Sequence, residues 1–291
     1  EYRKLAILKE LFPDCPVIAL TATATPEVER DIQTQLAMKK PVVVKGSFDR
    51  PNLMIRIQSK YKSDDQLLAF LKDHDKQSGI LYSSTRKGVD STFAMLQEAG
   101  FVVGRYHAGM QEHERASAQN AFLHDKTTLM VATVAFGMGI HKPDVRFIVH
   151  LDMPRTIEQY YQEIGRAGRD GLAAECLMLY SAQDLIIYKS FLEQLDDPVV
   201  RQQTKLKTDS MYRLCTSFKC RRLELLRYFG ESYSKVPCGA CDNCLAEYDQ
   251  IDGTVIAQKI LSCVFRLNQN VGMRMLTDVL RGSKAAALVQ R

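Results

Sequence analysis

Short apolar runs alternate with amphipathic stretches along the chain up to about residue 195. Apolar runs of four or five residues are typical of buried strands, whereas apolar residues spaced three and four apart indicate helices. The expected strands are 17–20, 42–45, 53–57, 79–82, 102–106, 129–132, 147–150 and 176–180. The expected helices are 26–36, 64–73, 87–99, 111–123, 156–163 and 182–194. This alternation predicts an α/β fold with a parallel sheet and helices on both faces, which binds ligands at the carboxyl ends of its strands.

The alternation stops after Pro198. Residues 199–229 look helical and basic, and two more helical patterns, 254–267 and 273–280, follow a cysteine-rich segment. Two packed helices without further elements would expose an apolar face. The opening EYRKLAILKELF has no initiator Met and resembles the middle of an amphipathic helix, so we expect the sequence to be part of a longer protein.

Composition excludes several classes of protein. An apolar content of 46% with 9 Pro and 16 Gly excludes a disordered or collagen-like chain, and no apolar run approaches the ~18 residues of a membrane span. There is no secretory signal, so we expect a cytoplasmic or nuclear protein. Residues 201–291 hold 15 Lys and Arg against 8 Asp and Glu, whereas residues 1–200 hold 24 against 26. This basic end indicates a polyanionic partner such as nucleic acid, although an ordinary basic surface would show the same charge.

Four of the eight cysteines have the spacing C-x17-C-x2-C-x2-C. Four thiolates at such spacing fit a closed tetrahedral zinc site, which has a structural role because no position remains open for water. An iron–sulfur cluster and reactive or fortuitous thiols are the alternatives. The expected zinc ligands are Cys220, Cys238, Cys241 and Cys244. The other four, which we expect to be small buried hydrophobes, are Cys15, Cys176, Cys215 and Cys263.

Unusual polar loops follow several expected strands. Residues 20–25 (LTATAT) place three hydroxyls before Pro26, where a plain helix cap would need one. Residues 82–87 (YSSTRK) combine hydroxyls and cations at a helix start, which suits either an anion or simple capping. The Gly-x-Gly loop in 133–140 is a weak signal by itself. Segment 159–171 holds Arg166 and Arg169, whose planar guanidinium groups suit phosphate oxygens, unless they lie in an ordinary surface loop.

These segments together resemble a known family. LTATAT at 20–25, ILYSSTRKGVD at 80–90, YHAGM at 106–110, VATVAFGMGIHKPDVRFIVH at 131–150 and QYYQEIGRAGRDG at 159–171 resemble motifs III, IV, IVa, V and VI of superfamily 2 helicases. The sequences of motifs V and VI, together with CRR at 220 and CGACDNC at 238, are similar to those of the RecQ DNA helicases. The resemblance implies the end of a first RecA-like lobe (1–45), a second lobe (46–195), a zinc-binding domain (196–248) and the truncated start of a winged helix (249–291).

The resemblance also implies roles for individual residues in an ATP-dependent 3′-to-5′ helicase that acts on single-stranded and duplex DNA in recombination and repair, with Mg²⁺ and structural zinc. The implied catalytic residues, including two arginine fingers, are Arg166, Arg169 and Gln162. Those implied to couple the nucleotide state to movement on DNA are Thr21, Thr23, Gly137, Gly139 and Asp144. Those implied to contact the single strand are Ser83, Ser84, Arg86, His107, Gly109 and Thr133.

The sequence departs from the family pattern in one major respect. It holds neither a G-x-x-x-x-G-K-[ST] loop nor a D-E-x-H, which would cradle the ATP phosphates and hold Mg²⁺. We therefore expect this chain to be inactive alone. His141 stands where the family more usually has Asn or Asp, and we expect it to be a spectator. The alternative function is a non-catalytic zinc-containing module that binds nucleic acid and carries an inactive RecA-like lobe; an RNA-unwinding enzyme is disfavoured by the cysteine segment.

Overall fold

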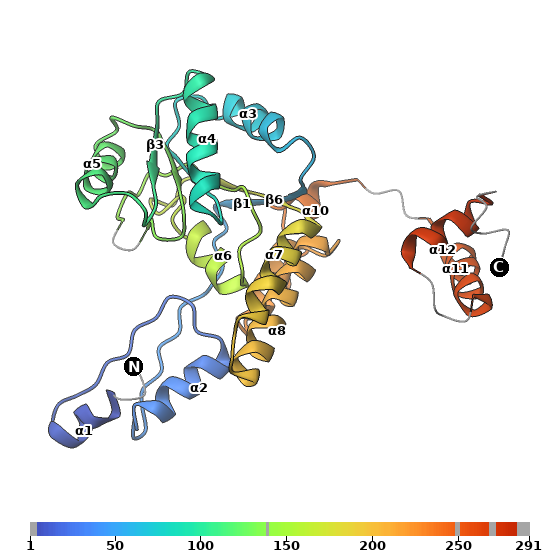
Figure 1. Ribbon diagram of the computed structural model, residues 1–291. Coiled ribbons are helices and arrows are strands. Elements are labelled where there is room, and N and C mark those ends of the chain that lie inside the picture. The colour runs from blue at the N-terminus through green and yellow to red at the C-terminus, as the bar shows by residue number, and fades with distance from the viewer. Residues whose placement is uncertain (1–4, 138–139, 248–250, 268–271, 284–291) are drawn as a thin grey trace. The chain divides into compact units, whose positions relative to one another are not determined.

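The computed structural model describes residues 5–137, 140–247, 251–267 and 272–283. The chain divides into two compact units, Glu1–Leu245 and Ala246–Arg291, both of which are drawn in Figure 1. The expected boundaries at 45, 195 and 248 stay predictions. No helix among the described residues is long and apolar enough to cross a membrane.

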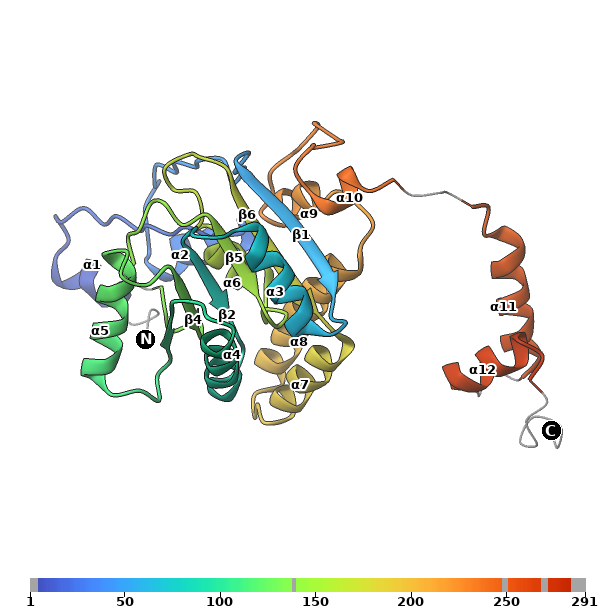
Figure 2. The same ribbon diagram turned by 90° about the horizontal axis from the view of Figure 1, so that it is seen from above.

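A six-stranded sheet forms the centre of the first unit (Figure 2). The strands are β1 (Leu53–Ser59), β2 (Gly79–Tyr82), β3 (Val103–Tyr106), β4 (Leu129–Ala132), β5 (Phe147–His150) and β6 (Ala174–Tyr180). All neighbouring strands pair in parallel, in the order β1-β6-β5-β2-β4-β3. The predicted parallel sheet is confirmed, and its carboxyl ends place the loops after β2, β3, β4 and β5 at one edge.

Two apolar cores cover the two faces of this sheet, because side chains alternate between the faces along each strand. Leu81 and Val131 contribute to one core, which α3 (Ser63–Asp73) and α4 (Arg86–Glu98) complete. Ile80 and Met130 contribute to the other core. The helices on that second face are α5 (Glu112–Leu123), α6 (Ile157–Ile164), α7 (Ala182–Glu193) and α8 (Pro198–Thr216). Helices on both faces, as predicted, are visible in Figure 1.

The predicted strands at 17–20 and 42–45 are wrong. The structure describes both segments and assigns a strand to neither. Ile18 and Val44 are 80% and 91% exposed, respectively. An apolar run becomes a strand only when a neighbouring strand satisfies its backbone groups, and neither segment has such a neighbour in the described chain. The described residues of this part of the chain form two α-helices, α1 (Ile7–Leu11) and α2 (Pro26–Gln35).

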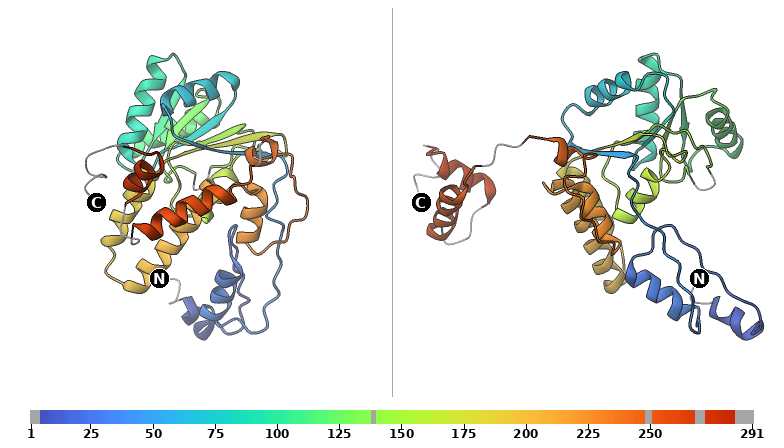
Figure 3. Two further views of the ribbon diagram at one scale, coloured as in Figure 1. Left: turned by 90° about the vertical axis from the view of Figure 1, so that its right-hand side faces the viewer. Right: turned by 180° about the vertical axis from the view of Figure 1, so that it is seen from behind.

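The predicted helical stretch 199–229 is divided into two helices. Helix α8 ends at Thr216, and α9 (Arg221–Tyr228) begins after Cys220, whose Sγ accepts a hydrogen bond from the backbone N of Leu223. Ser217 has an extended backbone at the junction, so the stretch cannot continue as one helix. Helices α7 and α8 pack on each other, as the two views of Figure 3 show, and the short α10 (Asp242–Leu245) follows the cysteine-rich segment.

The second unit contains α11 (Thr254–Arg266) and α12 (Met273–Leu280), which contact each other. Neither helix has a buried residue among those described. Large apolar side chains such as Leu261, Phe265 and Met273 are exposed, and Phe265 is 75% exposed. The predicted exposed apolar face is therefore present, whereas the winged helix stays a prediction.

Candidate nucleotide, nucleic-acid and metal sites

Arg166 and Arg169 both lie on the turn that follows α6, and both reach the loop after β4. Arg166 Nη1 donates a hydrogen bond to the carbonyl of Gly137, and Arg169 Nη1 donates to the carbonyl of Ile140 over 2.9 Å. Two segments about thirty residues apart are thus joined through the two predicted arginine fingers. Gly139, which was predicted in the same loop, lies outside the described residues.

Gly137 permits this contact because it has no side chain. Its φ of +133° is rare for other residues, and a Cβ built on it would lie 2.3 Å from Arg166 Cζ. The glycine therefore lets the guanidinium pack directly on the loop backbone. The sequence indicated a Gly-x-Gly loop, but the partner of that loop became visible only in the structure.

The two arginines form a cationic site. Neither makes an ion pair with a carboxylate among the described residues. Burial lowers the pKa of Arg169, and the nearby charges of Arg166 and Arg50 lower it further. Guanidinium groups that repel one another gain from an anion between them, and a polyphosphate is such an anion.

Gln162 joins this turn to the loop at 20–25. Its Nε2 donates a 2.7 Å hydrogen bond to Thr23 Oγ1, and the backbone N of Thr23 donates to Thr21 Oγ1 over 3.3 Å. Thr23 is buried. Thr25 has the ordinary capping role, because its Oγ1 accepts from the backbone N of Val28. Gln162 and Thr23, which were predicted in separate roles, therefore meet directly.

Asp144 makes none of these contacts with the arginines. It pairs with the Nζ of Lys142 over 3.1 Å, and Asp125 pairs with the same nitrogen over 2.6 Å. Burial alone would lower the pKa of Lys142, but the two carboxylates outweigh it and raise the pKa. In this structure Asp144 thus holds the base of the loop that contains exposed His141.

Ser83 and Ser84 both donate to a residue that the sequence analysis missed. The Oδ2 of Asp152 accepts from Ser83 Oγ at 3.0 Å, Ser84 Oγ at 3.0 Å and the backbone N of Ser84 at 2.8 Å. Its Oδ1 accepts from Lys60 Nζ at 2.7 Å. A hydroxyl has one hydrogen to donate, so both serine hydroxyls are engaged by a carboxylate in this structure. A signal was available, because Asp152 follows the end of β5 beside β2.

The other residues that were predicted to contact single-stranded DNA lie at the carboxyl ends of β2, β3 and β4. Arg86 begins α4, and a Cβ on Gly109 would lie 3.2 Å from its Cδ. His107 Nδ1 accepts from the backbone N of Gly109 at 3.1 Å, so its Nε2 is the donor toward Asp90 at 3.2 Å. The backbone N of Thr133 donates to Tyr106, at the end of β3. The structure thus brings the residues predicted to contact the single strand, called the single-strand track below, to one edge of the sheet.

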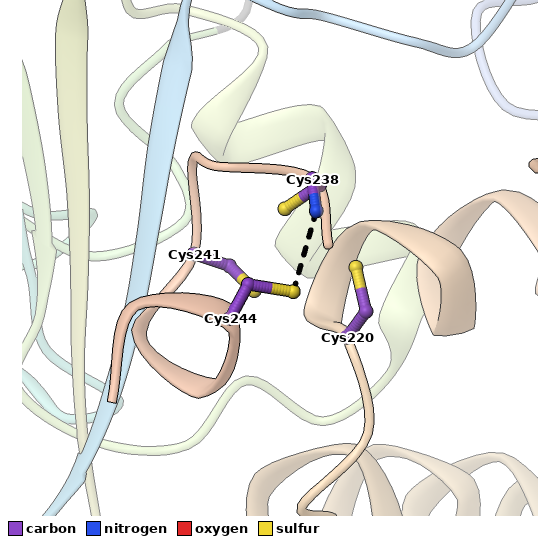
Figure 4. Close-up of side chains that lie close together, drawn as sticks. All are labelled: Cys220, Cys238, Cys241 and Cys244. Atoms are coloured by element: carbon purple, nitrogen blue, oxygen red, sulfur yellow. Dashed lines mark hydrogen bonds between the residues drawn. The ribbon is translucent and has the colours of Figure 1, made fainter. Parts of the chain in front are cut away.

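The four predicted zinc ligands meet. The sulfur atoms of Cys220, Cys238, Cys241 and Cys244 all lie within 4.8 Å of one another (Figure 4). A tetrahedral zinc site with Zn–S bonds of about 2.3 Å has sulfurs about 3.8 Å apart, so this arrangement fits zinc with little movement. Of the other cysteines, Cys176 and Cys215 are buried as expected, whereas Cys15 is exposed and Cys263 is half-buried, so that expectation is wrong for these two.

The cysteines differ in acidity. Burial raises the pKa of Cys220 to about 11. Burial would also raise the pKa of Cys238, but the backbone N–H of Ala240 and the neighbouring cysteine side chains outweigh it and lower the pKa. Thiolates are the form that binds zinc, and a thiolate at Cys220 would be stabilised by its position at the start of α9.

An arginine pair that follows Cys220 anchors this cysteine segment to the sheet. Arg221 binds both carboxylate oxygens of Asp242, at 3.0 and 3.2 Å, and Asp242 Oδ2 accepts from the backbone N of Ile57 in β1. Arg222 Nη2 donates to the carbonyl of Leu53, also in β1. Both arginines are buried. The CRR segment at 220 contributes to the family resemblance, but its attachment to β1 was not predicted from the sequence.

Three family models match consecutive parts of the chain. The helicase conserved C-terminal domain matches residues 61–171, the RecQ zinc-binding model matches 182–245, and the RQC domain matches 247–291. The four-cysteine cluster lies within the second match, which supports structural zinc.

Curated relatives match almost the whole chain. The ATP-dependent DNA helicase RecQ of Pasteurella multocida (strain Pm70) is 44% identical over 283 residues, covering 97% of this chain and 44% of that protein. The protein of the same name from Haemophilus influenzae (strain ATCC 51907 / DSM 11121 / KW20 / Rd) is 41% identical over 291 residues, covering 100% and 47%. The chain thus spans about half the length of these relatives.

A solved structure shares the fold. Saccharomyces cerevisiae Dbp5 bound to RNA and ADP BeF3 superposes with a TM-score of 0.53 at 18% identity, covering 70% of this chain and 58% of that one. At such low identity the likeness concerns the fold alone, and it confirms the predicted RecA-like sheet.

Proposed function

Because the chain belongs to the RecQ family of superfamily 2 helicases, we propose that it is the carboxy-terminal part of an ATP-dependent 3′-to-5′ DNA helicase. It supplies the arginine fingers, part of the single-strand track and a structural zinc site. The intact protein unwinds duplex DNA in recombination and repair.

One observation carries the catalytic part of this proposal: Arg166 and Arg169 share the loop at 137–140, while Gln162 on the same segment binds Thr23. Movement of the 20–25 loop is thereby transmitted to the turn that holds both guanidinium groups. Guanidinium groups brought to the transferred phosphoryl group stabilise the charge that develops on it.

The chain does not complete the nucleotide site. ATP with Mg²⁺ supplies the phosphoryl group and the metal charge, and the cradle for them needs a phosphate-binding loop that none of the 291 residues provides. This chain's own residues act on the far side of the phosphates. Both arginines are the proposed fingers; Arg169 is the more exposed of the two, and Arg166 also holds the loop through Gly137.

The test uses the intact protein with Arg169→Ala. We expect DNA-stimulated ATP hydrolysis to fall about 10³-fold or more, as for other arginine fingers, while single-stranded DNA binding is retained. The control is Arg227→Ala, which also removes one arginine but from the exposed side of α9; this variant should leave turnover unchanged. Turnover retained in Arg169→Ala would remove this residue from the catalytic role.

A further inference from the structure

Segment 47–52 contacts both α9 and the turn that follows α6 and holds the two proposed arginine fingers, called the arginine turn below. None of the roles assigned above includes this segment, which ends where β1 begins. The ring of Phe48 stacks on that of Phe229 at 4.6 Å and meets that of Tyr161 edge-on at 5.8 Å. Tyr161 Oη also donates to the carbonyl of Phe48 over 2.6 Å. The segment is therefore fixed to α6 as well as to α9.

A glutamate just beyond the end of α9 holds the segment by two short hydrogen bonds. The carboxylate of half-buried Glu231 accepts from Ser47 Oγ at 2.6 Å and from the backbone N of Phe48 at 2.7 Å. Hydrogen bonds to a carboxylate are stronger than those between neutral groups. The chain that follows α9 therefore sets the position of the backbone at 47–48.

The start of α9 holds the next two residues of the segment. Arg222, which is buried, pairs with the carboxylate of Asp49 and donates to the carbonyl of Arg50 over 2.8 Å. Helix α9 begins directly after Cys220, one of the four clustered cysteines. The helix thus connects the four-cysteine segment to residues 47–50 near both of its ends.

The far end of segment 47–52 holds the arginine turn. Arg50 Nη2 donates to the carbonyls of Ala167 and Gly168, both over 3.0 Å. Asn52 Nδ2 donates to the same Gly168 carbonyl over 2.9 Å and to that of Leu172 over 2.8 Å. Gly168 permits this approach, since a Cβ built on it would lie 2.5 Å from Asn52 Nδ2. Hydrogen bonds therefore fix the backbone on both sides of the second proposed finger.

We propose that Glu231, Arg50 and Asn52 are positioning residues for ATP hydrolysis. Helix α9 fixes segment 47–52, that segment fixes the arginine turn, and the turn holds Arg169 toward the phosphates. A catalytic group displaced by about 1 Å can lose about 10²-fold in rate, so these contacts control turnover without touching the nucleotide. The proposal rests on the proposed function, because it needs Arg169 to act on ATP.

The experiment measures kcat and KM for ATP in the intact protein at saturating single-stranded DNA. Glu231→Ala removes both hydrogen bonds to the segment. We expect its kcat to fall about tenfold or more, while KM for ATP and DNA affinity stay close to the native values. Glu98→Ala, which removes an exposed glutamate at the end of α4, is the control and should keep the native kcat.

Glu231→Gln tests whether the two hydrogen bonds carry the effect. The amide oxygen still accepts from the backbone N of Phe48, and the amide nitrogen donates to Ser47 Oγ, which also accepts. This variant should therefore keep most of the native kcat although it has lost the charge. A merely structural loss of stability would lower the melting temperature without this separation in kcat.

Asn52→Ala interrupts the same path at its other end and should also lower kcat. If both residues act through the arginine turn, the double variant Glu231→Ala/Asn52→Ala should lose no more than the larger of the two single losses. Zinc content and melting temperature show whether each variant is folded. Should Glu231→Ala lose its zinc, Asn52→Ala decides the outcome, because it lies outside the four-cysteine segment.

Native kcat in Glu231→Ala and Asn52→Ala, with Arg169→Ala inactive, would overturn this inference and leave the proposed function intact. Losses that multiply in the double variant, or an equal loss in Glu231→Gln, would overturn it too. A raised KM for ATP at unchanged kcat would assign these residues to ATP binding instead of positioning, and would also overturn it. Turnover retained in Arg169→Ala would overturn the proposed finger and this inference together.

Discussion

At the scale of single residues, Asp152 organises the loop ends more than any residue singled out in the sequence. It accepts from Ser83, Ser84 and Lys60, and Lys60 also reaches Asp184 at 3.1 Å. Three loop ends and α7 are thus held together by one cluster of charged side chains, of which Asp184 is buried and the other two are half-buried. Burial alone would raise the pKa of Asp152, yet the positive charge of Lys60 and the hydrogen bonds hold it below its ordinary value.

Asp152→Asn should destabilise the protein at neutral pH by about 1–3 kcal/mol, because the charged acceptor is lost. A lowered folded-state pKa contributes stability above the unfolded value of 3.8, and that stability is lost as the pH falls through the folded-state pKa. The difference between the variant and the native protein should therefore shrink below about pH 4. Urea unfolding at pH 7 and pH 3 measures it, with exposed Asp75→Asn as the control; a difference that does not vary with pH would contradict this account.

At the scale of elements, the cysteine segment is attached to β1 through an ion pair between buried Arg221 and half-buried Asp242. Arg221 and Asp242 connect the start of α9, the start of α10 and the backbone of Ile57. Arg221 also donates to the carbonyl of Ser217, just beyond the end of α8. The Arg221–Asp242 pair therefore holds three helices and an edge strand together.

Arg221→Ala should destabilise the first unit by about 1–3 kcal/mol, because the half-buried carboxylate of Asp242 would lose its charged partner. Arg227→Ala removes an arginine from the exposed side of the same helix and should have little effect. Thermal unfolding of the two variants compares them directly. Equal melting temperatures would show that the pair does not hold the segment to the sheet.

Cys241→Ser should remove zinc and unfold the region 210–248 locally, because metal binding and folding are coupled in small closed sites. Cys241 is fully buried, and its backbone forms a bridge to Ile55 of β1. Zinc content per chain, measured together with protease sensitivity, tests this prediction. Cys15→Ser lies outside the cluster and should keep the metal; unchanged zinc content in Cys241→Ser would contradict the ligand assignment.

At the scale of the whole molecule, the net charge of +5 is concentrated in residues 201–291, and the predicted track is at the edge of the sheet. Binding to a single strand should therefore weaken linearly with the logarithm of salt concentration. Arg86→Ala should lower the slope by about 0.7, the value for one phosphate contact on a single strand. Anisotropy titrations at several salt concentrations measure the slope, and binding insensitive to salt would refute a phosphate track.

The chain by itself should not hydrolyse ATP, with or without single-stranded DNA and Mg²⁺, since its 291 residues hold no phosphate-binding loop. A phosphate-release assay on the chain tests this expectation. DNA-stimulated turnover would require a different nucleotide site and would contradict the proposed division of the ATP site.

Local pattern was sufficient for much of the molecule. The strands at 79–82, 129–132 and 147–150 and the four zinc ligands are predictable because strand burial and cysteine spacing depend on neighbours in the sequence. The same reasoning failed at 17–20 and 42–45. Both segments have the apolar pattern of a strand, but a strand also needs a neighbour to pair with, and the described chain provides none for them.

The sequence by itself determined which residues could do chemistry, whereas the tertiary structure decided which of them meet. Gln162 and Thr23, which share a hydrogen bond, are 139 residues apart, and Arg222, which pairs with the carboxylate of Asp49, lies 173 residues from it. Ser83 and Ser84 looked free to bind phosphate until the fold placed Asp152 against them. The physical reason is the same in each case: a hydrogen bond or ion pair depends on distance in space, and chain position does not set that distance until the sheet order and its crossovers are known.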